Sequence, residues 1–273
     1  MDDLRYSLAD LLRVMQRLRD PETGCPWDIR QDFFSIVSST LEECYELAQA
    51  IEDQDFDHIA EELGDVLFQV VFYAQLGKER DLFSFEEIVQ TLVEKLIRRH
   101  PHVFARGQIE GIVLKSSSVE EIRRNWEDIK QLERNERNET DSLADIPLAL
   151  PALPRAQKVQ KRAAQVSFDW VETHAVLDKV QEELDELRQA MRGEHAEEIK
   201  DEMGDVFFSC VNLSRHLGLS AEETLRQSTS KFERRFKKME ALAAESGEPL
   251  AALSEKQLDQ LWCRAKDDLR GSR

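Results

Sequence analysis

The sequence has few of the features that mark secreted or membrane proteins. No apolar run approaches the roughly 20 residues that span a bilayer, and the first residues, Met1-Asp2-Asp3, show no signal-peptide pattern. The four cysteines are scattered and form no C-x-x-C pair, so we interpret them as reduced thiols and not as disulfides or metal ligands. These absences predict a cytoplasmic protein that does not contact a membrane.

Positive charge is also scarce. The chain has 37 Lys and Arg against 55 Asp and Glu, for a formal net charge of −18. A field of that sign repels a phosphate backbone, because nonspecific nucleic-acid affinity comes mainly from Lys and Arg. We therefore expect no direct binding to DNA or RNA. A free polyphosphate would be repelled as well, so such a ligand must arrive as a metal complex and meet local positive charge.

Signals for β-strands are weak, because runs of β-branched residues are short and no Asn-Gly or Asp-Gly turn is present. Apolar residues instead recur at helical spacing in both halves of the chain. The two halves are separated by a proline-rich segment, 141–154. The sequence predicts an all-α fold of tandem duplicated helical bundles, with domains at 1–140 and 141–273.

Each half contains three predicted helices with recognisable ends. They are 40–51, 57–76 and 84–100 in the first half, and 174–192, 196–217 and one that begins after Ser220 in the second. Ser39 and Ser84 are each followed three residues later by Glu, which predicts a capping box at a helix start. Gly77 predicts a helix end.

The sequence does contain one acidic pattern that occurs twice. Glu-Glu-x-x-Glu is followed, after fifteen intervening residues, by Glu-x-x-Asp, and the whole arrangement recurs 140 positions later. The acids are Glu42, Glu43, Glu46, Glu62 and Asp65 in the first copy and Glu182, Glu183, Glu186, Glu202 and Asp205 in the second. Helical geometry puts the acids of each motif on one face, and antiparallel packing of the two helices would bring four or five carboxylates together.

Such a cluster needs a cation, because carboxylates a few ångströms apart repel and raise one another's pKa. Oxygen-only sites suit Mg²⁺, with Mn²⁺ as a substitute. A solvated surface is the ordinary explanation of a single Glu-Glu-x-x-Glu, but such a surface is free to vary its spacing, and these intervals are identical. The repeat favours two metal sites. Gly64 and Gly204, inside the predicted helices, suggest a close approach there.

A basic cluster and a tryptophan also recur, both at an offset of 136. The residues are Lys95, Arg98, Arg99, Trp126 and Lys130 in the first copy and Lys231, Arg234, Arg235, Trp262 and Lys266 in the second. The lysine and last arginine of each cluster lie one helical turn apart and would present two cations to phosphate. Each Trp could stack on a base while the lysine one turn later meets phosphate. Surface salt bridges and core packing are the structural alternatives.

On these motifs the chain resembles the MazG family of nucleoside triphosphate pyrophosphohydrolases, within the all-α NTP pyrophosphatase superfamily. The likeness extends over nearly the whole chain, and the motifs are specific when they are found together. The segments that carry it are Gly24-Cys25-Pro26-Trp27-Asp28, 40–46, Glu62-Leu63-Gly64-Asp65, 98–104, Arg155-Ala156-Gln157-Lys158 and 231–236.

The resemblance implies Mg²⁺-dependent hydrolysis of nucleoside triphosphates between the α- and β-phosphates by a homodimer. It implies as metal ligands Glu183, Glu186, Glu202 and Asp205, matched in the first domain by Glu43, Glu46, Glu62 and Asp65. Glu182 is then the candidate base or a residue that positions a ligand, and Lys231 and Arg235 would neutralise charge on the leaving pyrophosphate. Because two-domain members can have unequal domains, we expect the second to be the main catalytic one.

Two other functions are compatible with the same residues. One is a narrow pyrophosphatase that acts on a single nucleotide, such as dUTP or phosphoribosyl-ATP. The other is a non-catalytic regulatory or scaffold protein that binds nucleotide or a partner without turnover. A panel of nucleotides separates the first from a housekeeping enzyme, and nucleotide-dependent stabilisation without product would indicate the second. The residue pattern does not identify the preferred base or sugar, or a regulatory partner.

Overall fold

The computed structural model describes residues 5–111, 118–136, 142–143, 146–193 and 195–270. Every regular element within these ranges is a helix, which confirms the all-α prediction. None of these helices combines the length and apolar character needed to cross a bilayer. The chain divides into two compact units, Met1–Glu133 and Arg134–Arg273. The predicted domain boundary, between residues 140 and 141, lies outside the described residues.

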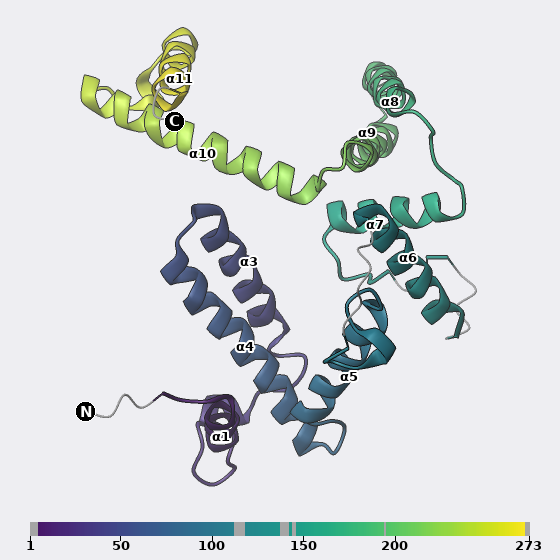
Figure 1. Ribbon diagram of the computed structural model, residues 1–273. Helices are drawn as coiled ribbons and strands as arrows, with labels where there is room; N and C mark the ends of the chain where they lie inside the picture. The colour runs from purple at the N-terminus through teal and green to yellow at the C-terminus, as the bar shows by residue number, and fades with distance from the viewer. Residues whose placement is uncertain (1–4, 112–117, 137–141, 144–145, 194, 271–273) are drawn as a thin grey trace. The chain divides into compact units, whose positions relative to one another are not determined.

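The first unit is built around an antiparallel helical hairpin, α3 and α4 (Figure 1). Gln54 ends α3 in the left-handed region with φ 57°, and the Asp55 carboxylate caps α4 by accepting the backbone N–H of His58 at 3.1 Å. The helices of this unit are α1 (Leu8–Leu18), α2 (Pro26–Ile29), α3 (Val37–Asp53), α4 (Phe56–Glu79), α5 (Phe85–Arg99), the 3₁₀ turn η1 (Ala105–Gly107) and α6 (Val119–Glu136), whose last three residues belong to the second unit.

The core of the first unit lies where α1 packs on the later turns of α4. Its buried residues are Met15, Ile36, Val71, Phe72 and Leu76. Burying side chains of this size contributes roughly 1.5–3 kcal/mol each. This core fixes the second half of α4 and leaves the earlier turns, which carry the acidic motif, for the functional site.

The second unit repeats the hairpin as α8 and α9 and adds α7 against it. The Gln160 side chain on α7 donates to the Phe208 carbonyl at 2.8 Å. Gln157 donates to the Leu219 carbonyl at 2.8 Å and accepts the Ala221 N–H at 3.1 Å, so it joins α7 to the start of α10. The helices are α7 (Ala152–Gln165), α8 (Thr173–Gly193), α9 (Ala196–His216), α10 (Ala221–Ser246), the 3₁₀ turn η2 (Leu250–Ala252) and α11 (Glu255–Arg270).

The helix ends confirm some of the predictions and correct two. Ser84 and Glu87 form the predicted capping box of α5, and the Ser220 hydroxyl accepts the Glu223 N–H at the start of α10. The predicted box at Ser39 is wrong, because α3 begins at Val37 and Ser39 lies inside it. Gly77 does not end α4, which continues to Glu79. A side chain at Gly77 would meet the Phe83 ring at 2.5 Å, so close packing explains this glycine.

Candidate active sites

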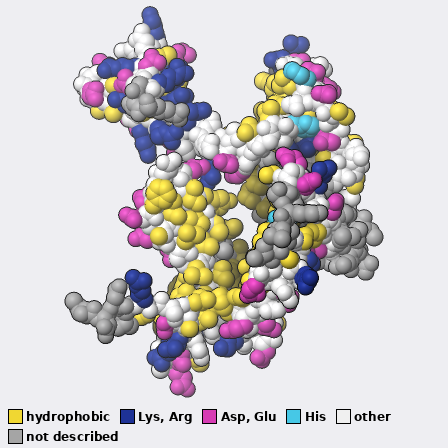
Figure 2. Space-filling model, in the orientation of Figure 1, with side chains coloured by type: hydrophobic (Ala, Val, Ile, Leu, Met, Phe, Trp, Pro, Cys, Tyr) yellow, Lys and Arg dark blue, Asp and Glu magenta, His cyan; other side chains and the backbone are white. Residues whose placement is uncertain are grey.

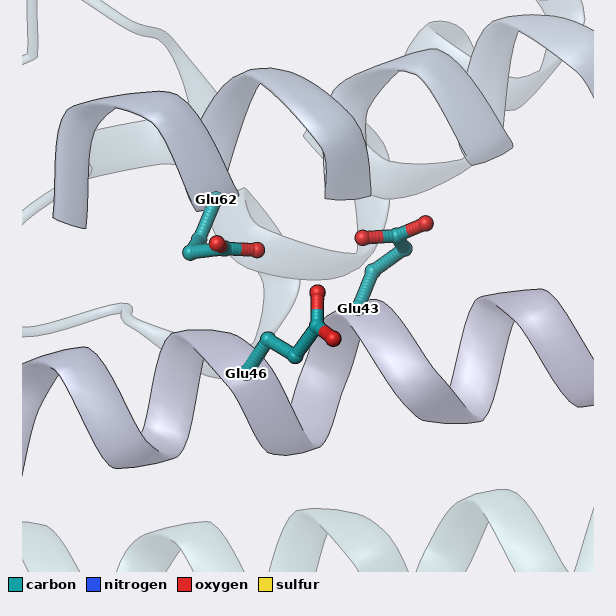
Figure 3. A group of neighbouring side chains, drawn as sticks. All are labelled: Glu43, Glu46 and Glu62. Carbon is teal, nitrogen blue, oxygen red and sulfur yellow. The ribbon is translucent and has the colours of Figure 1, made fainter. Parts of the chain in front are cut away.

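The first acidic site lies between α3 and α4. Figure 3 shows Glu43 and Glu46 from α3 and Glu62 from α4 pointing toward one another, with carboxylate oxygens within 4.8 Å. Glu62 is buried, and its Oε1 lies 2.7 Å from Nε2 of His58, one turn earlier on α4. Its other oxygen, Oε2, is buried without a hydrogen-bond partner. A buried acceptor without a partner is costly, so this oxygen is suited to a metal ligand.

The electrostatics of this site also favour a cation. Burial raises the pKa of Glu43 above its usual range, and the charges of Asp65, Glu46 and Glu62 raise it further. A cation would offset both effects, since it replaces lost hydration and lowers the repulsion. Asp65 is therefore close enough to act on Glu43, but it is exposed and does not join the group of three converging oxygens.

The second acidic site has the same construction on α8 and α9. Oxygens of Glu183, Glu186 and Glu202 lie within 4.8 Å of one another, and Glu183 is buried. A hydrogen bond shared with Glu183 raises the pKa of Glu186, and burial and the charges of Glu183 and Glu202 raise it further. Asp205, like Asp65, lies outside the group of three oxygens.

A lysine distinguishes the second site from the first. Nζ of Lys179 lies 2.8 Å from Oε1 of Glu182 and 3.0 Å from Oε1 of Glu183. Its hydrogen bonds to Glu182 and Glu183 raise the pKa of this amine above its usual range. At the matching position, 140 residues earlier, the first hairpin has Ser39. The second site thus carries a built-in positive charge that the first does not.

Both groups fit a divalent cation of the hard type. Each offers three glutamate oxygens from two packed helices, with a fourth carboxylate one turn after the glutamate of the second helix in the hairpin. Such oxygen-only donor sets suit Mg²⁺ and Mn²⁺ rather than Zn²⁺. The carboxylates alone do not distinguish between the two ions.

The basic residues of the first unit are held by a carboxylate. Nε of Arg98 donates to Oε1 of Glu133 at 2.8 Å, and Arg99 donates to both oxygens, at 3.3 and 2.5 Å. The Arg99 and Arg98 hydrogen bonds lower the pKa of Glu133 to about 2. Lys95, one turn earlier, lines the same cavity as Phe33 and Tyr73. The side chain of Lys130 lies outside the described residues.

In the second unit one of the corresponding arginines lies over a tryptophan. The guanidinium of Arg235 lies 5.8 Å from the ring centroid of Trp262, a distance at which cation–π attraction acts. Trp262 also packs against the α10–α11 core of Met239, Leu242 and Ala265, so its predicted contact with a base would use only part of the ring. Among the described residues, Lys231, Arg234 and Lys266 make no ion pair.

The structure brings the glutamates of each site together. Within the parts of the chain that are described, no hydrogen bond or ion pair joins Lys95, Arg98 or Arg99 to the first hairpin, or Lys231, Arg234 or Arg235 to the second. The expected close approach at Gly64 and Gly204 is also not met inside the described chain, because a side chain there would find no atom within 4 Å.

Three residues that contact predicted site residues were not themselves predicted. His58 and Lys179 each lie one turn before a predicted ligand, and this i, i+4 spacing is a signal that could have identified them. Glu133 is different, because it pairs with Arg98 and Arg99 across 35 and 34 residues. No local pattern predicts a contact at that separation.

Two acidic helical hairpins of this kind define an all-α protein with paired carboxylate clusters suited to a divalent cation. Comparison with known proteins narrows the class. Residues 31–104 and 172–240 each match the family described as the MazG nucleotide pyrophosphohydrolase domain. The chain belongs to this family and contains its domain twice, which confirms the resemblance and the duplication.

Relatives of known name match nearly the whole of this chain. The chain is 46% identical over 258 residues to the nucleoside triphosphate pyrophosphohydrolase of Escherichia coli, covering 94% of this chain and 95% of the relative. It is 44% identical over 266 residues to the nucleoside triphosphate pyrophosphohydrolase/pyrophosphatase MazG of Thermotoga maritima, covering 97% and 98%. It is 39% identical over 270 residues to the Bacillus subtilis protein YabN, covering 98% of this chain and 53% of that one.

Proposed function

We propose that this chain is a Mg²⁺-dependent pyrophosphohydrolase of ribo- and deoxyribonucleoside triphosphates, which yields nucleoside monophosphate and pyrophosphate. The observation that carries the proposal is the convergence of Glu183, Glu186 and Glu202 in a chain of the MazG family. Near-full-length relatives with this named activity support the substrate class. The proposal includes a cytoplasmic, housekeeping role in the nucleotide pool.

The metal would be held by the glutamates of each hairpin. We assign Glu183, Glu186 and Glu202 as ligands, with Asp205 joining them, and Glu43, Glu46, Glu62 and Asp65 as their counterparts. Mn²⁺ can substitute, because it prefers the same oxygen donors. When bound, the ion supplies positive charge that polarises the phosphate and favours nucleophilic attack.

The remaining chemistry is assigned to side chains of the second unit. Water attacks the α-phosphorus and transfers a proton to Glu182, whose carboxylate Lys179 holds at 2.8 Å. The bond from the α-phosphorus to the bridging oxygen breaks, and pyrophosphate leaves with the electron pair. Lys231 and Arg235 neutralise the charge that develops on it. Arg234 and Lys266 contact the phosphates, and Trp262 contacts the base.

We also propose that the active form is a homodimer. Apolar side chains gather on the surface over α3 and α4 (Figure 2). Those that are at least 38% exposed on this hairpin are Val37, Leu41, Tyr45, Ile51, Phe56, Leu63, Leu67 and Val70. An apolar face of this length on two helices is suited to a four-helix bundle with a second copy. The open space at Gly64 allows close approach of that copy.

The assembly is tested by light scattering during size-exclusion chromatography. Tyr45→Glu and Leu67→Glu place charges in the proposed interface and should shift the chain from dimer toward monomer. Leu148→Glu is the matched control, because Leu148 is also exposed and lies outside the hairpin. A wild-type chain that is monomeric at micromolar concentration would exclude the homodimer.

The activity is tested by product analysis of ATP, dGTP, dUTP and dCTP incubated with Mg²⁺. We expect monophosphate and pyrophosphate from several nucleotides, with turnover abolished in Glu186→Ala and retained in the matched variant Glu46→Ala. Loss in both variants would assign catalysis to both units. Turnover of one nucleotide alone would establish a narrow pyrophosphatase, and turnover of none would favour a binding or scaffold protein.

A further inference from the structure

The two units differ at the position of Glu133, which faces the arginines of the first unit. At the offset of 136 that relates the basic clusters, Glu133 corresponds to Leu269. The carboxylate of Glu133 binds Arg98 and Arg99, whereas their counterparts Arg234 and Arg235 make no ion pair among the described residues. We call Glu133 with its two arginines the Glu133 clamp.

The Glu133 clamp is more than an incidental surface pair. The Glu133 side chain is only 12% exposed, although Arg98 is 55% exposed, so the carboxylate is largely covered. It receives donors from two guanidinium groups, and Arg99 contacts both of its oxygens. The pair of Lys238 and Asp268 in the second unit, at 3.3 Å, is less enclosed, since its side chains are 34% and 40% exposed.

A carboxylate in this position competes with phosphate for the same donors. The planar fork of an arginine binds carboxylate and phosphate with the same geometry and cannot lose its charge near neutral pH. Glu133 occupies the Nε–Nη2 edge of both arginines, so a polyphosphate could use these forks only after displacing Glu133, which would then lose the two charges that stabilise it. Binding to the first unit must supply the free energy of this exchange.

We propose that Glu133 is a built-in anion that occupies the phosphate-binding arginines of the first unit, so that this unit holds a polyphosphate site that is closed in the resting chain. The proposal rests on the function proposed above for the nature of the ligand, a nucleoside triphosphate with its divalent cation. The proposal gives a physical reason why the two units would differ in nucleotide binding. Their acidic ligands are alike, but among the described residues a carboxylate already neutralises the arginines of the first unit and not those of the second.

The test counts binding sites on the full-length chain by calorimetry. The probe is α,β-methylene-ATP with Mg²⁺, which has no hydrolysable bond between the α- and β-phosphates. We expect one site per wild-type chain and two in Glu133→Leu, the added site at least about tenfold tighter than any residual binding to the wild-type first unit. Glu133→Gln, which keeps the shape of the side chain, should also give a second site and guards against misfolding of the leucine variant.

Matched variants distinguish the specific effect of the Glu133 clamp on nucleotide binding from the effect of a change in net charge. Asp128→Asn removes one negative charge from an exposed position on the same helix and should leave one site. A second site in this variant, or a single site in both Glu133 variants, would overturn the proposal. The reciprocal change, Leu269→Glu, should weaken the site of the second unit about tenfold, and unchanged affinity there would also count against the clamp.

The outcome is independent of the proposed enzymatic activity. If the wild-type chain binds the analogue but produces no pyrophosphate from ATP, the proposed function fails, and the number of sites still reports on the clamp. If the wild-type chain hydrolyses ATP and the Glu133 variants gain no site, the clamp fails and the proposed function stands.

Discussion

The two acidic hairpins differ in the cations beside them far more than in their acids. Both place three glutamate oxygens within 4.8 Å. The first has His58 beside its buried glutamate, and the second has Lys179 on two carboxylates. The arginines of the first unit are paired with Glu133, whereas Arg235 of the second lies over Trp262. The comparison teaches that a duplicated acidic site can keep its converging glutamates while the charged residues around the two copies diverge.

The largest effect should come from the buried ligands. We expect Glu183→Gln to lower kcat/KM for nucleoside triphosphates by about 100-fold or more, because a ligand that helps to hold polarising charge at the phosphate is lost. Glu43→Gln, at the matching position of the first hairpin, should change it less than about twofold. Steady-state release of pyrophosphate measures both, and equal losses would remove the functional difference between the hairpins.

Substitutions of the arginines should also affect turnover differently in the two units, but the difference should be smaller than for the buried ligands. Arg235→Ala should lower kcat about 30-fold with a smaller change in KM, because its charge is needed as the leaving pyrophosphate forms. Arg99→Ala should leave turnover within about twofold of wild type, since that guanidinium is paired with Glu133. Kinetics with one nucleotide under saturating Mg²⁺ make the comparison. A strong loss of turnover in Arg99→Ala would show that the first unit takes part in the reaction.

The cations beside the acids should contribute unequally to stability. Without divalent metal, Lys179→Met leaves buried Glu183 without its nearest positive charge and should lower the free energy of unfolding by about 2 kcal/mol. His58→Ala should cost about half as much, because its ring contacts one carboxylate oxygen and not two. Urea unfolding in a chelating buffer measures both. A larger loss of unfolding free energy in His58→Ala than in Lys179→Met would contradict this prediction.

The smallest effect concerns pH. The pKa of Glu43 is raised in the folded chain, so between the usual glutamate pKa and the raised value the folded state binds more protons than the unfolded state. Stability without metal should therefore fall as pH rises through that window, by up to about 1 kcal/mol. Melting temperatures of wild type and Glu43→Gln from pH 4 to 7 test this. The same pH dependence of the melting temperature in both proteins would contradict this prediction. So would a pH dependence of the wild type that Mg²⁺ does not reduce.

Local patterns predicted most of the fold and the acidic groups because both depend on short separations. The repeated spacing correctly placed three glutamates of each set together, and Ser84 with Glu87 marked the start of α5. Ser39 failed as a cap because apolar packing around Ile36 lets the helix begin earlier. Gly77 failed as a stop because its role is set by Phe83, a tertiary neighbour.

The partners of the basic residues could not be predicted in the same way. Lys95 and Arg98 lie one turn or less apart, so their spacing alone predicted that they belong to the same helix, α5. Whether a carboxylate meets them depends on where α6 lies, and the contact with Glu133 spans 35 residues. The tie between Gln157 and the start of α10 spans 64 residues and was unpredictable for the same reason.

The position of Glu133 has a practical consequence for work with isolated halves of the protein. It is the last residue of the first compact unit, and α6 continues to Glu136. An expressed fragment that stops at residue 132 would leave both arginines free, and one that stops at residue 136 would keep them occupied. Two laboratories whose fragments differ by four residues would then report opposite results for nucleotide binding by the same half, and the choice of cut would decide the answer.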